Sequence, residues 1–224
     1  MKVVPSILAE RFDDFLLKLR QAEAFADFVQ IDIMDGLFVE TMSFPPEKIN
    51  SVVTSLNYEV HLMVKDPLSF MSRIAHPGLR KVIFHFEAET RHPDLIGKIR
   101  ERGLAPGMAI KPETRLDEFG SIAEQVDTLL FLTVDPCCYG HPFKPEVLDK
   151  VAEARKLFPH KQIAVDGGVS LDNLKMFVDA GVDYACVGSR IFQNGDPAEN
   201  YRRFRGKVAE LENAQVPNQA VRTR

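Results

Sequence analysis

Short segments rich in β-branched and aromatic residues alternate along this chain with amphipathic segments of helical length, and few folds accept this order. Strict alternation implies parallel strands joined by right-handed crossovers. Eight such units in 224 residues favour a closed (β/α)8 TIM barrel of the α/β class, with an open doubly wound sheet as the alternative. We expect the strands at residues 2–8, 27–34, 58–64, 81–87, 105–111, 127–135, 162–166 and 183–187.

Helices are expected between the strands, and they can be read most directly at residues 11–25, 144–158 and 170–181. The last of these opens on Ser170, a favourable N-cap, and closes on Gly181. No linker or composition shift marks a second domain. We therefore predict one barrel domain over residues 1–215, followed by a flexible tail at 216–224.

Charge and composition narrow the classes of function. A formal net charge of −4 and scattered basic residues do not favour a nucleic-acid partner. The N-terminal segment lacks the apolar run of a signal peptide, and no stretch approaches the roughly 18 apolar residues of a membrane span, so we expect a cytoplasmic protein without a membrane partner. The odd number of cysteines, with Cys137 next to Cys138 and Cys186 apart, predicts reduced thiols, and the CC pair has poor geometry for a metal or redox site.

Polar residues collect where the expected strands end, which in a TIM barrel is the active-site face. Two-residue alternation places Gln30, Asp32 and Met34 on one face of their strand. If that face is the interior, Asp32 meets His61 and Asp166. These rim residues are Ser6, Asp32, Asp35, His61, His85, Glu87, Lys111, Asp135 and Asp166.

Two carboxylates on separate strands suit a reaction in which one removes a proton and the other returns it on the opposite face. A histidine beside Asp32 and Asp166 also suits a divalent metal that stabilises negative charge on a substrate oxygen. The structural alternative is that these groups only pair with one another or with the backbone. The glycine-containing turns at 165–170 and 187–192 add a weaker signal for a phosphate site, because loops seven and eight often bind phosphate in this fold.

The chain resembles the ribulose-phosphate 3-epimerases over nearly its whole length. The motifs that carry this resemblance are PSILA, IDIMDGLFV, VHLMVKDP, FHFEAE, GMAIKPET, LTVDP, VDGGVS and VGSRIF. The resemblance implies a TIM barrel that inverts C3 of a ketopentose phosphate through an enediolate, with Asp32 and Asp166 as the acid–base pair. It also implies a bound divalent metal (Zn, Fe, Mn or Co), and family members are often homo-oligomers.

The resemblance also implies roles for individual residues of this chain. It makes Asp32, His61 and Asp166 metal ligands, and it places Gln30 where the family usually has a fourth ligand, a histidine. A glutamine carbonyl is a weaker ligand than imidazole, so metal occupancy depends on Gln30. The remaining residues implied to touch the phosphorylated sugar are Ser6, His61, Met34, Met63, Gly140, Gly167, Gly168, Gly188 and Ser189.

Other departures from the family pattern also lie at the mouth. The loop at 135–141 reads DPCCYGH where the family has a glycine-rich NPGFGGQ, Leu132 stands where a third methionine is expected, and the loop at 36–46 differs from the family's GHFVPN. Two alternatives to epimerisation follow. One is a sugar-phosphate-binding barrel without catalysis and with a weakened metal site. The other is aldol or decarboxylation chemistry, which the missing DxKxxD pattern weighs against.

Overall fold

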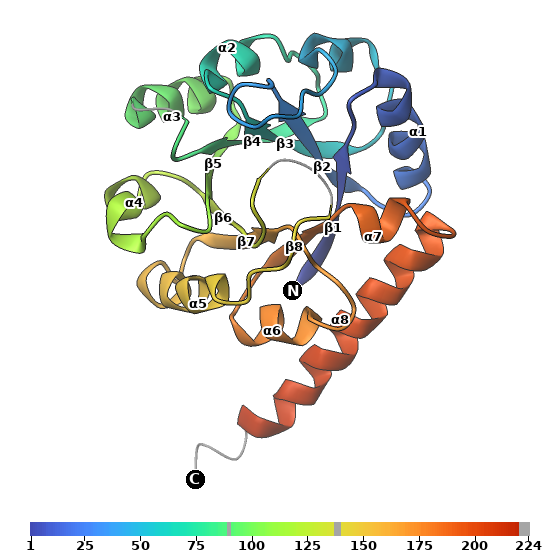
Figure 1. The fold of residues 1–224 in the computed structure, drawn as a ribbon, viewed down its shortest axis with the longest axis vertical. Helices are drawn as coiled ribbons and strands as arrows, with labels where there is room; N and C mark the ends of the chain where they lie inside the picture. The colour runs from blue at the N-terminus through green and yellow to red at the C-terminus, as the bar shows by residue number, and fades with distance from the viewer. Residues whose placement is uncertain (89–90, 137–139, 220–224) are drawn as a thin grey trace.

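The computed structural model describes residues 1–88, 91–136 and 140–219, with side chains up to Ala214. Parallel strands form a closed barrel in sequence order, each hydrogen-bonded to the next and the last to the first, with helices around the outside (Figure 1). The prediction of a (β/α)8 TIM barrel is confirmed, and the open sheet is excluded. The strands are β1 (Lys2–Leu8), β2 (Phe28–Met34), β3 (Asn57–Met63), β4 (Leu79–His85), β5 (Ala105–Ile110), β6 (Thr128–Leu132), β7 (Gln162–Asp166) and β8 (Tyr184–Val187).

Helical segments connect the strands on the outside of the barrel. The β2–β3 connection carries a short 3-10 helix, η1, where the other connections carry α-helices. None of the helices among the described residues is long and apolar enough to cross a membrane. The helical segments are α1 (Phe12–Ala22), η1 (Pro46–Ser51), α2 (Pro67–Ser72), α3 (His92–Glu101), α4 (Leu116–Ala123), α5 (Val147–Leu157), α6 (Leu174–Asp179), α7 (Ser189–Phe192) and α8 (Pro197–Gln219).

The sequence-based strand boundaries agree with the structure to within three residues. β1 and β7 match their expected ranges, whereas β6 ends at Leu132 and not at residue 135. After β6 the chain turns away from regular pairing, and the backbone of Thr133 instead joins Asp166 and Lys144 at 2.8 Å each. β4 ends at His85, so Glu87 lies in the turn that follows it and not in the strand.

The C-terminal helix runs further than expected. α8 continues to Gln219, so residues 216–219, which were expected in a flexible tail, extend this helix. Tyr201, Phe204 and Val208 are buried in the core and anchor its first half. Once those turns are formed, the helix extends by one hydrogen bond for each residue ordered, which is more favourable than starting a new helix. Residues 220–224 lie outside the described part, and the domain boundary at 215 stays a prediction.

The barrel interior is part apolar and part polar. Its apolar part includes Ile83, Leu130 and Ala164, which pack together in one small cluster. Two fully buried polar residues, Glu59 and Gln30, also lie inside. A buried charge is tolerated only when it is paired, and the amine of Lys81 lies 3.0 Å from Glu59. The interior therefore contains buried polar side chains as well as an apolar cluster.

Candidate active site

A cleft at the carboxyl ends of the strands brings together most of the residues that the sequence singled out. Register explains the convergence, because Asp32 pairs with His61 across β2 and β3, and Ser6 pairs with Gln30 across β1 and β2. The position matches the active-site face of this fold. The cleft is lined by Ser6, Leu8, Asp32, His61, Met63, Leu132, Val134, Asp135, Pro136, Asp166, Gly167, Gly168, Cys186, Gly188 and Ser189.

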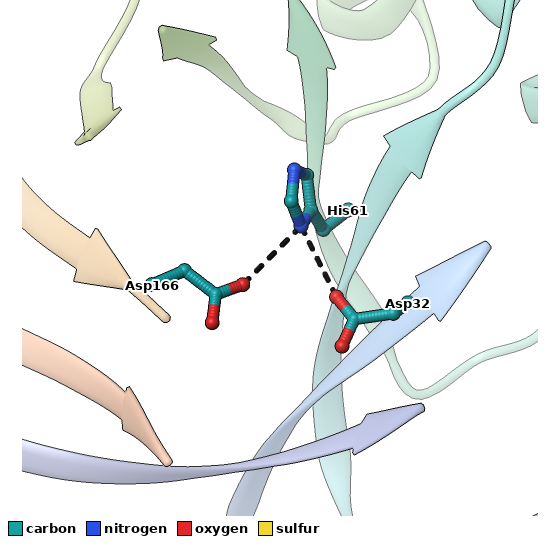
Figure 2. A group of neighbouring side chains, drawn as sticks. All are labelled: Asp32, His61 and Asp166. Atoms are coloured by element: carbon teal, nitrogen blue, oxygen red, sulfur yellow. Dashed lines mark hydrogen bonds and ion pairs between the residues drawn. The ribbon is translucent and has the colours of Figure 1, made fainter. Parts of the chain in front are cut away.

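One imidazole nitrogen joins the two predicted acid–base carboxylates. The Nδ1 of His61 lies 3.1 Å from Oδ1 of Asp32 and 3.4 Å from Oδ2 of Asp166, as Figure 2 shows. One ligand atom from each residue lies within 4.8 Å of the others, so the three side chains could hold a metal ion. Carboxylate oxygens and imidazole nitrogen suit zinc and other divalent transition metals. The donor set therefore fits the metal that the resemblance implies.

Gln30 meets the same carboxylates with its amide nitrogen. Its Nε2 donates to Oδ1 of Asp32 at 2.9 Å and to Oδ2 of Asp166 at 2.7 Å. Its Oε1 accepts a hydrogen bond from the thiol of Cys186 at 3.0 Å. An amide nitrogen has no free lone pair for a cation. In this arrangement Gln30 organises the carboxylates, and the predicted fourth ligand requires its amide to turn over.

Burial and mutual contact change the acid–base behaviour of the cluster. Burial raises the pKa of Asp32, and the nearby charge of Asp166 acts in the same direction. Burial alone would lower the pKa of His61, but hydrogen bonds to Asp166 and Asp32 outweigh it and raise that pKa to about 9. The hydroxyl of Ser6 donates to Oδ2 of Asp32 at 2.6 Å. The His61 ring thus holds a proton at neutral pH beside the two carboxylates, and perturbed pKa values of this kind are typical of functional sites.

An apolar wall closes one side of the cleft. Met34 and Met63 pack with Val39 in a small buried cluster, and Phe38 and Leu8 lie against it. Met63 reaches the cleft lining, whereas Met34 is almost fully buried behind it. The carboxylate of Asp35 accepts hydrogen bonds from the backbone of residues 37, 38 and 65, so Asp35 shapes this loop and does not face the cleft chemistry.

The predicted phosphate residues divide into two groups. Gly167, Gly168, Gly188 and Ser189 line the cleft, and Ser189 begins the expected short helix α7. Gly140 has a φ of +101° and is exposed but does not line it.

Gly167 also has a structural reason to be glycine. Its φ is +104°, and an added Cβ would lie 2.4 Å from a methyl of Val134. Nearby, the predicted rim residue Asp135 pairs with Lys144. The prediction for Cys137, Cys138 and Tyr139 falls outside the described residues.

Sequence reasoning missed a polar column below the cluster. Glu59 is fully buried, pairs with Lys81 and accepts the hydroxyl hydrogen of Tyr184 at 3.0 Å. Cys186, two residues after Tyr184, extends this column to Gln30, because its thiol donates a hydrogen bond to the Gln30 amide oxygen. The signal was available, because Glu59 stands two residues before His61 and strand alternation places both inside.

A larger cavity, about 750 Å³, lies at the opposite end of the barrel, against α8. Its charged lining includes Lys2, Arg80, Lys81 and Arg205 together with Asp27 and Glu212. The amine of Lys81 is already engaged by Glu59. The residues suited to proton transfer face the other end, where this fold places its active sites.

Comparisons with known proteins agree with the geometry. Solved structures of similar fold include 3-hexulose-6-phosphate synthase from Salmonella typhimurium, with a TM-score of 0.69 and 16% identity over 94% of this chain and 100% of that chain. Another is KGPDC from Streptococcus mutans in complex with D-R5P, with a TM-score of 0.67 and 13% identity over 93% and 97% of the two chains. At these identities the likeness shows the fold alone.

Closer relatives share the sequence as well. A ribulose-phosphate 3-epimerase of Schizosaccharomyces pombe is 30% identical over 94% of this chain and 95% of its own length. The Mycobacterium bovis ribulose-phosphate 3-epimerase is 34% identical over 88% of each chain. The model of the ribulose-phosphate 3-epimerase family matches residues 2–192. The chain therefore belongs to the ribulose-phosphate 3-epimerase family, whose members are isomerases.

Proposed function

We propose that this chain interconverts a ketose phosphate and its C3 epimer, with D-ribulose 5-phosphate and D-xylulose 5-phosphate as the first pair to test. One observation carries the proposal. Asp32 on β2 and Asp166 on β7 enter the same cleft from strands separated by β1 and β8, and both lie within 3.4 Å of one His61 nitrogen. Carboxylates held on two sides of a pocket can act on opposite faces of one carbon.

In the proposed reaction, each of the two carboxylates carries out one proton transfer. The C3 hydrogen is acidic because it lies next to the ketone, so one carboxylate can remove it and leave an enediolate. The other carboxylate then returns a proton to the far face, which inverts the centre. Gln30 holds both carboxylates through Nε2, and Ser6 holds Asp32, so their positions change little between the two steps. Such preorganisation lowers the cost of reaching the transition state.

A metal ion fits the proposal through Asp32, His61 and Asp166. When bound, zinc, iron, manganese or cobalt would supply Lewis-acid stabilisation of the charge that develops on the substrate oxygens. Gln30 would join this set only with its amide turned over, since Oε1 now faces Cys186.

The substrate class rests on the other half of the cleft. Gly167, Gly168, Gly188 and Ser189 line the cleft beside the cluster, and Ser189 begins α7, a setting suited to a phosphate. The related fold of KGPDC was solved in complex with D-R5P, which is consistent with a phosphorylated sugar. A cytoplasmic location and a homo-oligomeric state are part of the same proposal. The rice relative is named a cytoplasmic isoform.

Exchange of the C3 hydrogen in heavy water tests the proposal directly. With metal supplied, the wild type should incorporate deuterium at C3 of ribulose 5-phosphate. Asp166→Asn should lower the rate at which ribulose 5-phosphate and xylulose 5-phosphate interconvert by about 10²–10⁴-fold, since inversion needs both carboxylates and the change removes one at nearly constant volume. Asp172→Asn, an exposed carboxylate in the loop after β7, is the matched control and should keep the wild-type rate. No exchange with ribulose 5-phosphate or other ketose phosphates would refute the proposal.

The non-catalytic alternative is favoured by one observation, the donation of Gln30 Nε2 to both carboxylates. These two hydrogen bonds give both carboxylates a donor without a bound cation. Metal analysis and calorimetry separate the two functions. Saturable ribulose 5-phosphate binding, together with absent metal uptake and absent exchange, would establish a binding protein.

A further inference from the structure

Behind His61, away from the cleft, lies a chain of hydrogen bonds that the proposed proton transfer does not use. The Nε2 of His61 lies 3.0 Å from Nε2 of His85. The other ring nitrogen of His85, Nδ1, lies 3.2 Å from Oε2 of Glu87. The rings of His61 and His85 lie edge to edge, with centroids 5.1 Å apart and planes inclined by 29°. The chain therefore leads from the cluster to a carboxylate just beyond the end of β4.

Glu87 is surrounded by hydrogen-bond donors. Its Oε1 accepts from the backbone N–H of Lys111 at 2.9 Å and from the hydroxyl of Thr114. A backbone N–H can only donate, so this end of the carboxylate must accept. Burial alone would raise the pKa of Glu87, but hydrogen bonds from His85 and Thr114 lower it to about 2. An ionised carboxylate only accepts, and His85 must therefore donate from Nδ1.

His85 is fully buried and has one hydrogen to give. The ring of Phe38 covers it, with centroids 4.7 Å apart. Full burial beneath this aromatic ring favours the neutral form of His85, which carries a single ring hydrogen. With its hydrogen on Nδ1, the Nε2 of His85 is an acceptor. The nitrogen 3.0 Å away, Nε2 of His61, must then be the donor.

We propose that Glu87 and His85 are positioning residues that decide which ring nitrogen of His61 is free to bind a cation. Because the hydrogen on Nε2 is fixed by His85, the lone pair of a neutral His61 lies on Nδ1. That atom faces Asp32 and Asp166. A proton or a metal ion at Nδ1 satisfies both carboxylates, and the opposite tautomer could bind no metal there. Partners of this kind orient and tune metal-binding histidines in general. The inference rests on the metal-binding part of the proposed function.

The hydrogen on His85 can be observed without metal or substrate. Nitrogen-15 NMR of histidine-labelled, chelator-treated protein at neutral pH should show His85 as a neutral ring with its hydrogen on Nδ1. In Glu87→Gln the side-chain amide can donate to Nδ1, so the hydrogen should move at least in part to Nε2. A wild-type His85 with its hydrogen on Nε2 would overturn the proposal, and this holds even if the variant does not fold.

Metal affinity gives the second readout. Titration with Co²⁺, followed by absorbance, should show about 10–100-fold weaker binding by Glu87→Gln than by the wild type. Glu113→Gln is the matched control, because it removes the same charge from an exposed position one residue before Thr114 and should bind Co²⁺ as the wild type does. Equal affinities of the two variants would contradict the proposal. Neither readout involves a sugar, so a wild type that gives the expected spectra and affinities but no exchange would refute only the proposed function.

Discussion

Raising the pH should destabilise the metal-free protein through His61. Its pKa in the folded protein is about 9, against 6.5 for an unperturbed histidine. The folded state therefore holds a proton that the unfolded state has lost between these values. A raised pKa stabilises the fold fully below pH 6.5, and this stabilisation disappears as the pH passes through 9. The free energy of unfolding of chelator-treated protein should fall over this window.

The structure sets the size of the effect. The difference between the two pKa values corresponds to about 3 kcal/mol, since a tenfold change in proton affinity is about 1.4 kcal/mol. The energy arises because the imidazolium of His61 lies between Asp32 and Asp166, whose hydrogen bonds and charges outweigh the opposing effect of burial. A domain is typically stable by about 5–15 kcal/mol. At this chain length, about 3 kcal/mol corresponds to a fall in Tm of about 6–12 °C.

Urea unfolding followed by circular dichroism, at steps between pH 6 and pH 10, measures this change. The control is His61→Gln, which removes the titrating ring, and the pH dependence of the wild type relative to this variant isolates the histidine. Wild-type and variant curves that stay parallel across the window would refute the reasoning. Should the variant not fold, NMR titration of the His61 ring gives the same answer, and a midpoint near 6.5 would contradict it.

Three further changes test other parts of the site. Gln30→His replaces an amide donor with an imidazole ligand, so Co²⁺ affinity should rise by tenfold or more, and unchanged affinity would show that Gln30 does not limit metal binding. Lys81→Met removes the partner of the buried Glu59 carboxylate and should lower the free energy of unfolding by about 3–5 kcal/mol in urea melts. Combining Lys81→Met with Glu59→Leu should recover most of the lost stability. Gly167→Ala should lower the free energy of unfolding by about 1–3 kcal/mol because of the positive φ, and further because the new Cβ would clash with Val134. Adding Val134→Ala should recover only the part that is due to the clash. Equal stability of Gly167→Ala and the wild type would contradict this reasoning.

The position of most site residues could be predicted because strand periodicity is local. Two-residue alternation placed Asp32 and His61 inside, and the parallel order of eight strands placed both at one rim with Asp166. Element ends were less predictable. Glu87 fell outside its expected strand because β4 ends at His85, and α8 ran past the expected start of the tail. Ends depend on which backbone groups find partners, which a single segment does not reveal.

The sequence by itself determined the barrel, the family and the carboxylate–histidine set, because each is encoded in the order of strands, helices and short motifs. Only the tertiary structure decided how these groups meet. The amide of Gln30 could face the carboxylates with either end, and in the folded protein Nε2 donates to Asp32 and to Asp166, which lies 136 residues away in the chain, while Oε1 accepts from Cys186, 156 residues away. The hydrogen on His61 likewise depends on His85 and its partner carboxylate from the turn after β4. Hydrogen-bond direction is set by neighbours in space, and closure of the barrel is what makes them neighbours.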